Sequence, residues 1–317
     1  MSFSAILLAL LLEQARPLGP GNSLHGAMRA WVRMARLNFD AGQHPHAWLA
    51  WSVAVLLPTA VALAIHWVLA TTLGWFVAVL WSVAVLYVSL GFRQFSHHFT
   101  DIRDALEAGD DAEARRLLAD WRQIDARELG TSEIVRQVIE HSVLSAHRHV
   151  FGVLAWFSVL AALGLGPAGA VLYRLSEFVP RYWAHQAAAE QQPVSPALLD
   201  ASTRIWRNID WVPARITALG FAVVGSFEEA IDSWRNYVER SNGMPDQDGI
   251  ILAATSGAVN VRLGTERPDP GAPDVPGQTG GQEAQFAHLR SIVGLVWRSV
   301  VMWMLMLALL SLARLLG

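Results

Sequence analysis

The stretch AWLAWSVAVLLPTAVALAIHWVLATTLGWFVAVLWSVAVLYVSLGF, residues 47–92, contains no Asp, Glu, Lys or Arg. An α-helix rises about 1.5 Å per residue, so about 20 residues cross the roughly 30 Å core of a bilayer. The stretch is about twice that length, and TTLG at 71–74 offers a break near its middle. The sequence therefore predicts a transmembrane helical hairpin, with Pro58 tolerated inside its first helix.

Two further apolar blocks extend this assignment. Residues 291–313 carry only one charge, Arg298, so 286–317 is expected to form a C-terminal transmembrane helix. Residues 151–173 are free of charge, but GLGP at 164–167 is a strong helix breaker. The segment 151–178 is therefore either a third span or a re-entrant helical hairpin. The expected fold is all-α, a polytopic helical membrane protein with three to four spans.

The rest of the chain divides by composition into four segments. We expect an N-terminal interfacial helix and polar segment at 1–46 and a small cytoplasmic helical subdomain at 93–150. We expect an interfacial or cytoplasmic helical region at 179–263 and a disordered Pro/Gly linker at 264–285. The arginine distribution places the N-terminus, Gln137 and Gln278 in the cytoplasm.

Local signals define the helices of the predicted subdomain. Gly109 interrupts the helical pattern, and the Asp residues after it can cap the next helix. Thr131 is expected to cap a third helix, with Glu133 in its first turn. The apolar face of that helix consists of Ile134, Val135, Val138 and Ile139.

Composition excludes several kinds of chemistry. The chain has no cysteine, and all 24 of its basic residues are arginine, which excludes thiolate sites, the P-loop lysine and Schiff-base chemistry. The net charge of −3 gives no sign of a nucleic-acid partner. The eleven histidines lack the spacing of three or four residues typical of a helical metal pair within their dense groups, so we expect no metal site and no cofactor.

Four residues are candidates for binding a ligand. Glu140 lies at helical spacing from Arg136 and near Arg148, so it forms either an ordinary ion pair or part of a binding face. In NIDWVPAR at 208–215, Asp210 is expected to cap a helix whose first turn holds Pro213. Arg215 would then stand near the helix N-terminus, where a small anion can bind, unless Asp210 neutralises it.

The order of these features resembles the CobD/CbiB superfamily of bacterial inner-membrane proteins, and within it most closely AmpE. The opening LLALLLEQARPLG, the hairpin, FGVLAWFSVLAALGLGPAG and IDWVPARI carry this resemblance. GIILAATSGAVNVRLGTER, at 249–267, resembles the cobalamin branch instead. Enzymes of that branch use ATP to join an aminopropanol phosphate to adenosylcobyric acid through an amide. The resemblance implies a multi-pass protein of the bacterial inner membrane.

The chain departs from the pattern of the cobalamin branch at several carboxylates. Glu140 matches the first glutamate, but HSVLSAHRHVFG after it lacks the expected Glu-Asn pair and Asp. The early Asp-Pro is replaced by Glu13-Gln14, and a double aspartate is reduced to Asp210. The loss of these carboxylates removes the obvious metal and phosphate ligands and argues against enzymatic activity.

The expected function is therefore a non-enzymatic membrane regulator resembling AmpE, a modulator of β-lactamase induction linked to cell-wall recycling. Its expected partners are the lipid bilayer and either a small anionic ligand or a membrane or cytoplasmic protein. The first alternative is a cobalamin biosynthesis protein of the CobD/CbiB type, an ATP-dependent corrinoid amide synthase. A transporter-like role, based on the broken helix at 164–167, is the second.

Overall fold

The computed structural model describes residues 2–15, 23–189, 194–241, 245–264 and 281–316. Apart from one isolated bridge between Val261 and Gln282, the regular secondary structure of these residues is helical, which confirms the all-α prediction. The chain forms two compact units. The first consists of Met1–Gly91, Arg148–Pro213 and Leu307–Gly317, and the second of Phe92–His147 and Ala214–Met306.

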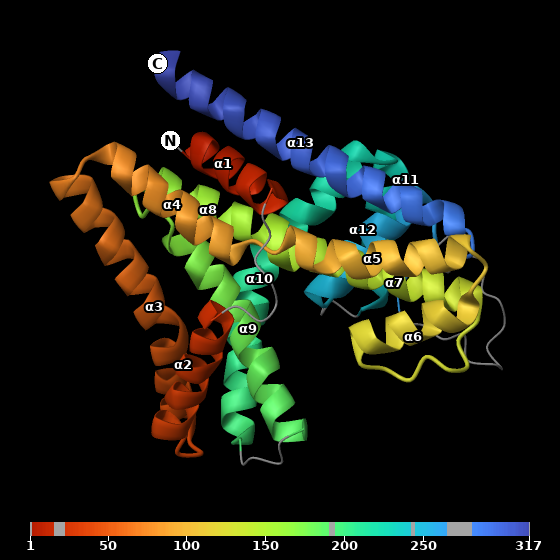
Figure 1. Ribbon diagram of the computed structural model, residues 1–317, viewed down its shortest axis with the longest axis horizontal. Helices are drawn as coiled ribbons and strands as arrows, with labels where there is room; N and C mark the ends of the chain where they lie inside the picture. Colours follow the sequence, from red (N-terminus) through yellow and green to blue (C-terminus); the bar gives the residue numbers. More distant parts are fainter. Residues whose placement is uncertain (1, 16–22, 190–193, 242–244, 265–280, 317) are drawn as a thin grey trace. The chain divides into compact units, whose positions relative to one another are not determined.

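The first unit contains the two helices of the predicted hairpin (Figure 1). Helix α3 spans His44–Thr72 and α4 spans Trp75–Ser89, so the chain breaks where the sequence predicts it. Pro58 lies inside α3. The other helices of this unit are α1, α2, α8, α9 and the first part of α10, at Ser2–Ala15, Ser23–Phe39, Gly152–Ala162, Ala168–Ala189 and Pro196–Val224.

Residues 151–173 do not form one helix. Helix α8 ends at Ala162 and α9 begins at Ala168, and both Gly164 and Gly166 adopt the positive φ that glycine tolerates best. A Cβ at Gly152 would strike Tyr173, and one at Gly169 would strike the backbone of Trp156. These two close approaches pair α8 and α9 in antiparallel register. The helical geometry is that of a hairpin, and its insertion into the membrane as a re-entrant segment stays a prediction.

Three helices of the described chain are long and apolar enough to cross a membrane. They are His44–Thr72, Thr131–Ala162 and Phe286–Ala313. The second of them begins in α7, well before the charge-free block on which the sequence prediction depended. The sequence prediction started from residues without charge, and so it began at residue 151. The helix in the structure starts earlier, in a polar segment that includes Glu133.

The core of the first unit lies where α2, α3, α9 and α10 meet. Trp183 of α9 is fully buried there, and its indole Nε1 donates to the carbonyl of Val32 at 3.3 Å. The backbone N–H of Ser195, just before α10, donates to the carboxylate of Asp40 at 3.0 Å. The polar part of the segment predicted at 1–46 is thus largely the helix α2, packed into the core by its Val32 and Ala35.

The second unit contains α5, α6, α7, α11 and α12, at Phe92–Glu107, Asp111–Arg122, Thr131–Ala146, Phe227–Arg240 and Gln247–Val259, and much of α13, Phe286–Leu316. Asp110 caps α6 as the sequence predicts, accepting a hydrogen bond from the N–H of Glu113 at 3.0 Å. The predicted cap of α7 is wrong. Gly130 is the N-cap residue, and the Thr131 hydroxyl instead donates to Asp111 at 2.7 Å.

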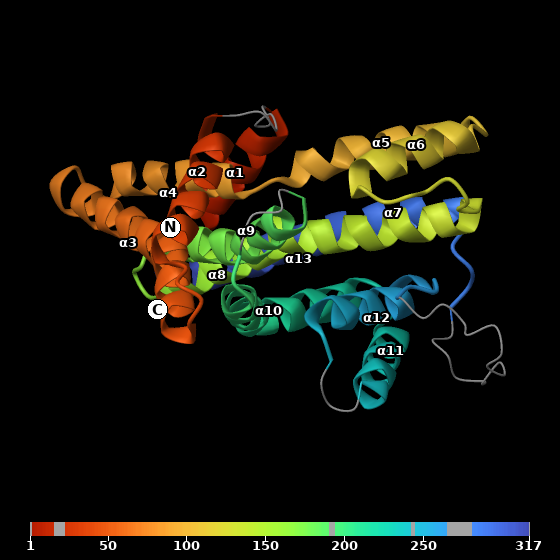
Figure 2. The same ribbon diagram turned by 90° about the horizontal axis from the view of Figure 1, so that it is seen from below.

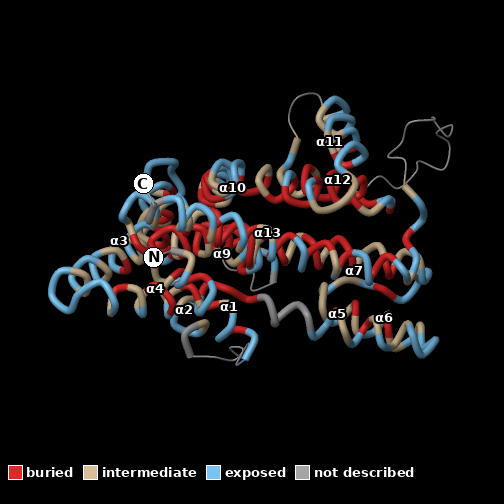
Figure 3. The backbone as a smooth tube through the Cα atoms, turned by 90° about the horizontal axis from the view of Figure 1, so that it is seen from above, coloured by how far each residue is buried: buried red, intermediate tan, exposed pale blue. Residues whose placement is uncertain are grey.

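Helices α11 and α12 form the closest packed pair of the second unit (Figure 2). A Cβ at Gly257 would lie 2.1 Å from the carbonyl oxygen of Glu229, so only glycine permits this approach. The N–H of Ser226 also donates to the carbonyl of Ala258 at 3.1 Å. Figure 3 shows that α12 and α7 are buried over much of their length.

The linker predicted to be disordered at 264–285 lies mostly outside the described residues, which stop at Gly264 and resume at Gly281. For the residues between them it stays a prediction, and the last residues of the linker make backbone hydrogen bonds. Gln282 donates its N–H to the carbonyl of Asn260 at 3.1 Å and accepts from the N–H of Arg262 at 2.8 Å. These backbone bonds order a segment whose composition alone indicated no structure.

Candidate functional site

The candidate site is built around Glu140, on the inner face of α7. The apolar residues of this helix at the positions predicted to be its buried face are fully or almost fully buried, and Glu140 is only 6% exposed among them. Helix α7 packs against α5, α6 and α12, all within the second unit. A carboxylate at this depth is costly unless other groups hydrogen-bond to it, so its partners define the site.

Two donors meet at one oxygen of Glu140. Oε1 accepts from Nη1 of Arg136 at 2.7 Å and from the backbone N–H of Gly264 at 2.9 Å. The same Nη1 also donates to the carbonyl of Gly264 at 3.2 Å, while Arg136 makes further bonds to Glu133. The ion pair expected at this spacing is therefore present. Its two side chains also hydrogen-bond to the backbone N–H and carbonyl of Gly264.

Gly264 belongs to the segment that follows α12. Asn260 ends that helix in a left-handed conformation, and the hydroxyl of Ser256 donates to the carbonyl of Val261 at 2.6 Å. The bridge between Val261 and Gln282 fixes the next residues. The end of this segment is thus held against the Glu140 carboxylate by backbone geometry that the sequence did not show.

Arg215 stands at the other end of α12. Its Nη1 donates to the side-chain oxygen of Gln247 at 2.8 Å, and partial burial lowers the pKa of the guanidinium. The carboxylate of Asp246 caps α12 and also accepts from the Tyr237 hydroxyl at 2.9 Å. Burial, and then the hydrogen bond to Asp246, raise the pKa of Tyr237. Glu140 and Arg215 both belong to the second unit.

Asp210 belongs to the first unit and does not cap a helix. It lies inside α10, which begins at Pro196, and it is 1% exposed and accepts from the Tyr173 hydroxyl at 2.8 Å. The predicted anion site at a helix N-terminus is therefore wrong. The prediction assumed that Pro213 lies in a first turn, whereas it lies well inside α10.

A proline inside α10 leaves one carbonyl without its usual partner. Because Pro213 has no N–H, the carbonyl of Ile209, four residues earlier, lacks its helical donor. The indole Nε1 of Trp156 supplies the replacement, at 3.0 Å from that oxygen. The helix can thus continue through the proline, and this tertiary contact explains why the sequence rule failed.

A second polar cluster lies on α9, in the first unit. Glu177 is almost fully buried and accepts from Nη1 of Arg174 at 2.6 Å, and Arg181 also forms an ion pair with it. This cluster was not predicted, although the helical spacing of its three residues could have indicated it. Arg148, the remaining predicted candidate, lies in a short π-helix, His147–Phe151, and belongs to the same unit.

The described residues contain no group of three or more His, Asp or Glu side chains that could hold a metal ion. Three of the histidines contact groups other than carboxylates. His98 stacks on Trp121, His141 meets the edge of the same indole, and Nδ1 of His147 lies 2.9 Å from the hydroxyl of Thr217.

Comparison with known proteins shows the family. The model for the family described as CobD/Cbib protein matches residues 3–311. The chain is 30% identical to the cobalamin biosynthesis protein CobD of Stutzerimonas stutzeri over 96% of each chain. It is 31% identical to the protein of that name from Chromobacterium violaceum over 57% of this chain and 54% of the relative, and 24% identical to that of Leptospira interrogans over 68% and 67%. No solved structure matches significantly.

The fold and these matches define a polytopic helical membrane protein, and the chain belongs to the CobD/CbiB family. The predicted superfamily is confirmed. The expectation of a regulator resembling AmpE is wrong, because the relatives carry the name of a cobalamin biosynthesis protein and none of them supports a specific likeness to AmpE. The loss of several carboxylates is therefore compatible with similarity to these relatives along most of the chain.

Proposed function

We propose that this protein acts in cobalamin biosynthesis and forms the amide that joins an aminopropanol phosphate to adenosylcobyric acid. The support is family membership over nearly the whole chain and the printed names of the relatives. The substrates come from the resemblance to the cobalamin branch. The protein would act in the bacterial inner membrane, in keeping with three helices of membrane-spanning length.

One structural observation carries this proposal. Glu140, which matches the first glutamate of the cobalamin-branch pattern, contacts the segment at 249–267 that resembles this branch, because its carboxylate accepts from the N–H of Gly264. Glu140 and Gly264 are 124 residues apart in the chain.

The chemistry of amide formation assigns different tasks to protein and substrates. A carboxylate does not react with an amine at a useful rate, so ATP must convert one carboxyl oxygen of the corrinoid into part of a leaving group. The amine nitrogen then forms the C–N bond, loses a proton, and the activated oxygen departs with its phosphoryl group. The protein has to hold two anionic substrates close together and exclude water.

Glu140 is best described as a positioning residue in this scheme. Its Oε1 is already occupied by Arg136 and Gly264, so it fixes the end of the α12 segment and does not use that oxygen to accept a proton. Arg215 is the candidate for the phosphate of the smaller substrate, because a guanidinium matches phosphate geometry. Arg148 is the second candidate for an anion.

The residues present do not fit a metal held by the protein. The segment after Glu140 lacks the Glu-Asn pair and the Asp of the family pattern, and the described residues provide no cluster of three metal-ligating side chains. The proposed roles therefore concern binding and positioning by arginine, glutamate and backbone groups.

Complementation tests the proposal. A bacterial strain that lacks its corrinoid amide synthase should regain cobalamin-dependent growth when it expresses this chain. Glu140→Ala should abolish or strongly reduce rescue, because it releases Gly264 and leaves Arg136 with one carboxylate fewer. Glu113→Gln is the matched control, since Glu113 pairs with Arg116 on the exposed side of α6.

Membrane-fraction immunoblots must show equal amounts of each variant. Rescue by the wild type and by Glu113→Gln, with loss in Glu140→Ala, supports the proposal. Failure of a well-expressed wild type to rescue growth on adenosylcobyric acid, in a strain that a known synthase does rescue, would refute the proposed activity.

A further inference from the structure

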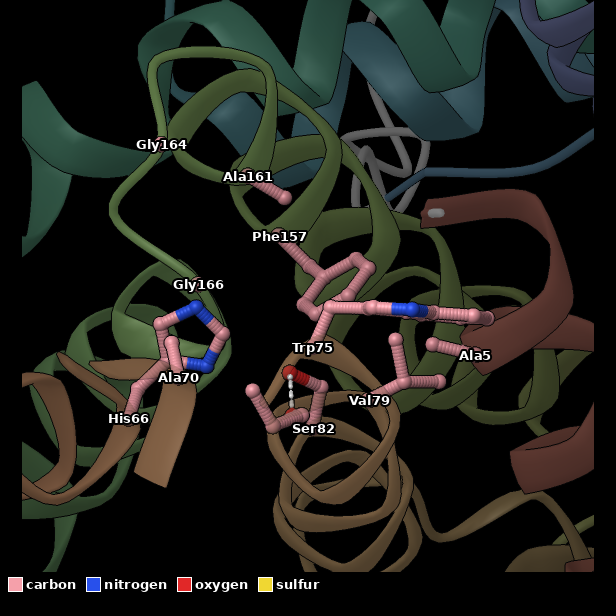
Figure 4. Close-up of a pocket in the computed structure, with 11 residues that line it drawn as sticks. Ala5, His66, Ala70, Trp75, Val79, Ser82, Phe157, Ala161, Gly164 and Gly166 are labelled. Carbon is pink, nitrogen blue, oxygen red and sulfur yellow. Dashed lines mark hydrogen bonds between the residues drawn. The ribbon is translucent and has the colours of Figure 1, made fainter. Parts of the chain in front are cut away.

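A cavity of about 240 Å³ lies in the first unit, where α1, α3, α4, α8 and the turn after α8 meet (Figure 4). It exists because its walls are made of small residues at places where larger ones would fill it. These are Ala5, Ala70, Ala78, Ala161, Gly164 and Gly166. Its volume exceeds the roughly 150 Å³ of an engineered cavity that binds benzene, and it falls short of the roughly 300 Å³ typical of the smallest drug-sized pockets.

The turn that closes one side of this cavity is fixed to α3. The indole Nε1 of Trp67 donates to the carbonyl of Gly164 at 3.2 Å. The ring of His66 lies against Gly166, so closely that a Cβ there would come within 2.5 Å of it. Figure 4 shows the imidazole beside this turn, between α3 and the rest of the cavity wall. The wall is therefore part of the packed structure of the unit.

The lining is apolar except for two side chains. The Ser82 hydroxyl donates a hydrogen bond to the carbonyl of Ala78 at 3.0 Å. The imidazole of His66 donates to the backbone carbonyl of the same Ala78, so the second nitrogen of the neutral ring can only accept. Both polar side chains therefore already have an acceptor on the protein for their proton.

The protein surface around the cavity is apolar as well. Four large side chains near its lining, from α3, α4 and the turn after α8, are more than half exposed: Val68, Leu73, Phe76 and Leu163. Trp75, which lines the cavity, is 63% exposed. Such a surface on a membrane protein faces lipid, so a molecule that enters here comes from the bilayer and not from water.

We propose that this cavity holds the end of an acyl chain of a membrane phospholipid. A hydrocarbon chain fits the apolar walls and the volume of the cavity. This inference concerns a lipid site and is independent of the proposed enzymatic function. It predicts a lipid that is bound in one place, apart from the lipids that merely surround the helices.

Photolabelling in nanodiscs tests it, using phosphatidylethanolamine with a diazirine near the end of one acyl chain. Phe157 lines the cavity and is 1% exposed, whereas Val159 of the same helix is 47% exposed and faces outward. Peptide mapping should find adducts on both residues. Only a chain inside the cavity can reach Phe157, so its adduct reports the site and the Val159 adduct reports the surrounding lipid.

Filling the cavity with a larger side chain should lower the Phe157 adduct and leave the Val159 adduct unchanged. Ala161→Leu should lower the ratio of Phe157 to Val159 adducts by roughly tenfold, which corresponds to about 1.4 kcal/mol. Ala162→Leu, at the exposed neighbouring position, should leave the ratio unchanged. If Ala161→Leu does not reach the membrane fraction, Ala70→Val narrows the cavity from α3 and should have the same effect.

One further arm identifies the part of the lipid that is bound. Exchange of the ethanolamine head group for glycerol should leave the adduct ratio unchanged, because only the chain is bound. Absence of a Phe157 adduct in the wild type, or a Phe157 adduct that persists equally in the filled variants, would overturn the proposal.

Discussion

The Gly257→Ala substitution should destabilise the second unit more than any change of one methyl group at an open position. The new Cβ would lie 2.1 Å from the carbonyl oxygen of Glu229 and 2.6 Å from the Cα of Ala230. Both atoms are backbone, so α11 and α12 must separate by roughly 1 Å to restore normal contact. Overpacking of this kind costs about 1–3 kcal/mol, and rigid backbone atoms place it at the upper end.

Gly294→Ala is the matched control, because nothing lies within 4 Å of a Cβ at that position of α13. It should leave stability unchanged or raise it by up to about 1 kcal/mol through helix propensity. Thermal unfolding in detergent, followed by tryptophan fluorescence, should show Gly257→Ala melting roughly 4–10 °C below the wild type. Equal melting temperatures for Gly257→Ala and the wild type would refute the close packing of α11 on α12.

Two other predictions concern the first unit. Burial, and then the charges of Arg174 and Arg29, lower the pKa of His25, so the stability that its neutral form contributes is complete above the unfolded value of 6.5 and is lost as pH falls below it. His25→Gln should flatten this loss in melting curves taken from pH 7 to 5, and an unchanged slope would contradict the assignment. Trp156→Phe should cost about 1–3 kcal/mol by leaving the Ile209 carbonyl without a donor. Pro213→Ala restores a backbone N–H for the Ile209 carbonyl, so Trp156→Phe should cost less stability in the Pro213→Ala protein. A double-mutant cycle that shows no coupling between Trp156 and Pro213 would contradict this role of the indole.

Signals that act over a few residues were readable from the sequence. The absence of charge over 47–92 indicated the two hairpin helices, and the break at 71–74 lies where α3 ends and α4 begins. The capping of α6 by Asp110 follows from the local preference of aspartate for helix starts. The same local rules failed at Thr131, because a hydroxyl that could cap the helix found Asp111 of another helix instead.

Features that depend on contacts between distant segments were not readable. The pairing of Glu140 with Arg136 followed from their spacing along the helix. The hydrogen bond from Gly264 to Glu140 depends on how the chain folds back after α12. The position of Asp210 inside a helix depends on Trp156 replacing the donor that Pro213 lacks. The buried Arg174–Glu177 pair was overlooked because its residues read as an ordinary polar stretch between apolar ones.

The most direct test of the proposed function is turnover by the purified protein in nanodiscs. Adenosylcobyric acid, aminopropanol phosphate and Mg·ATP should give the corrinoid amide, detected by mass spectrometry as the condensation product, with ATP consumed in step with the amide formed. The product should be absent when any one substrate is omitted and strongly reduced with Glu140→Ala. No product from a folded wild-type preparation, under conditions where an established synthase of the family is active, would contradict the account.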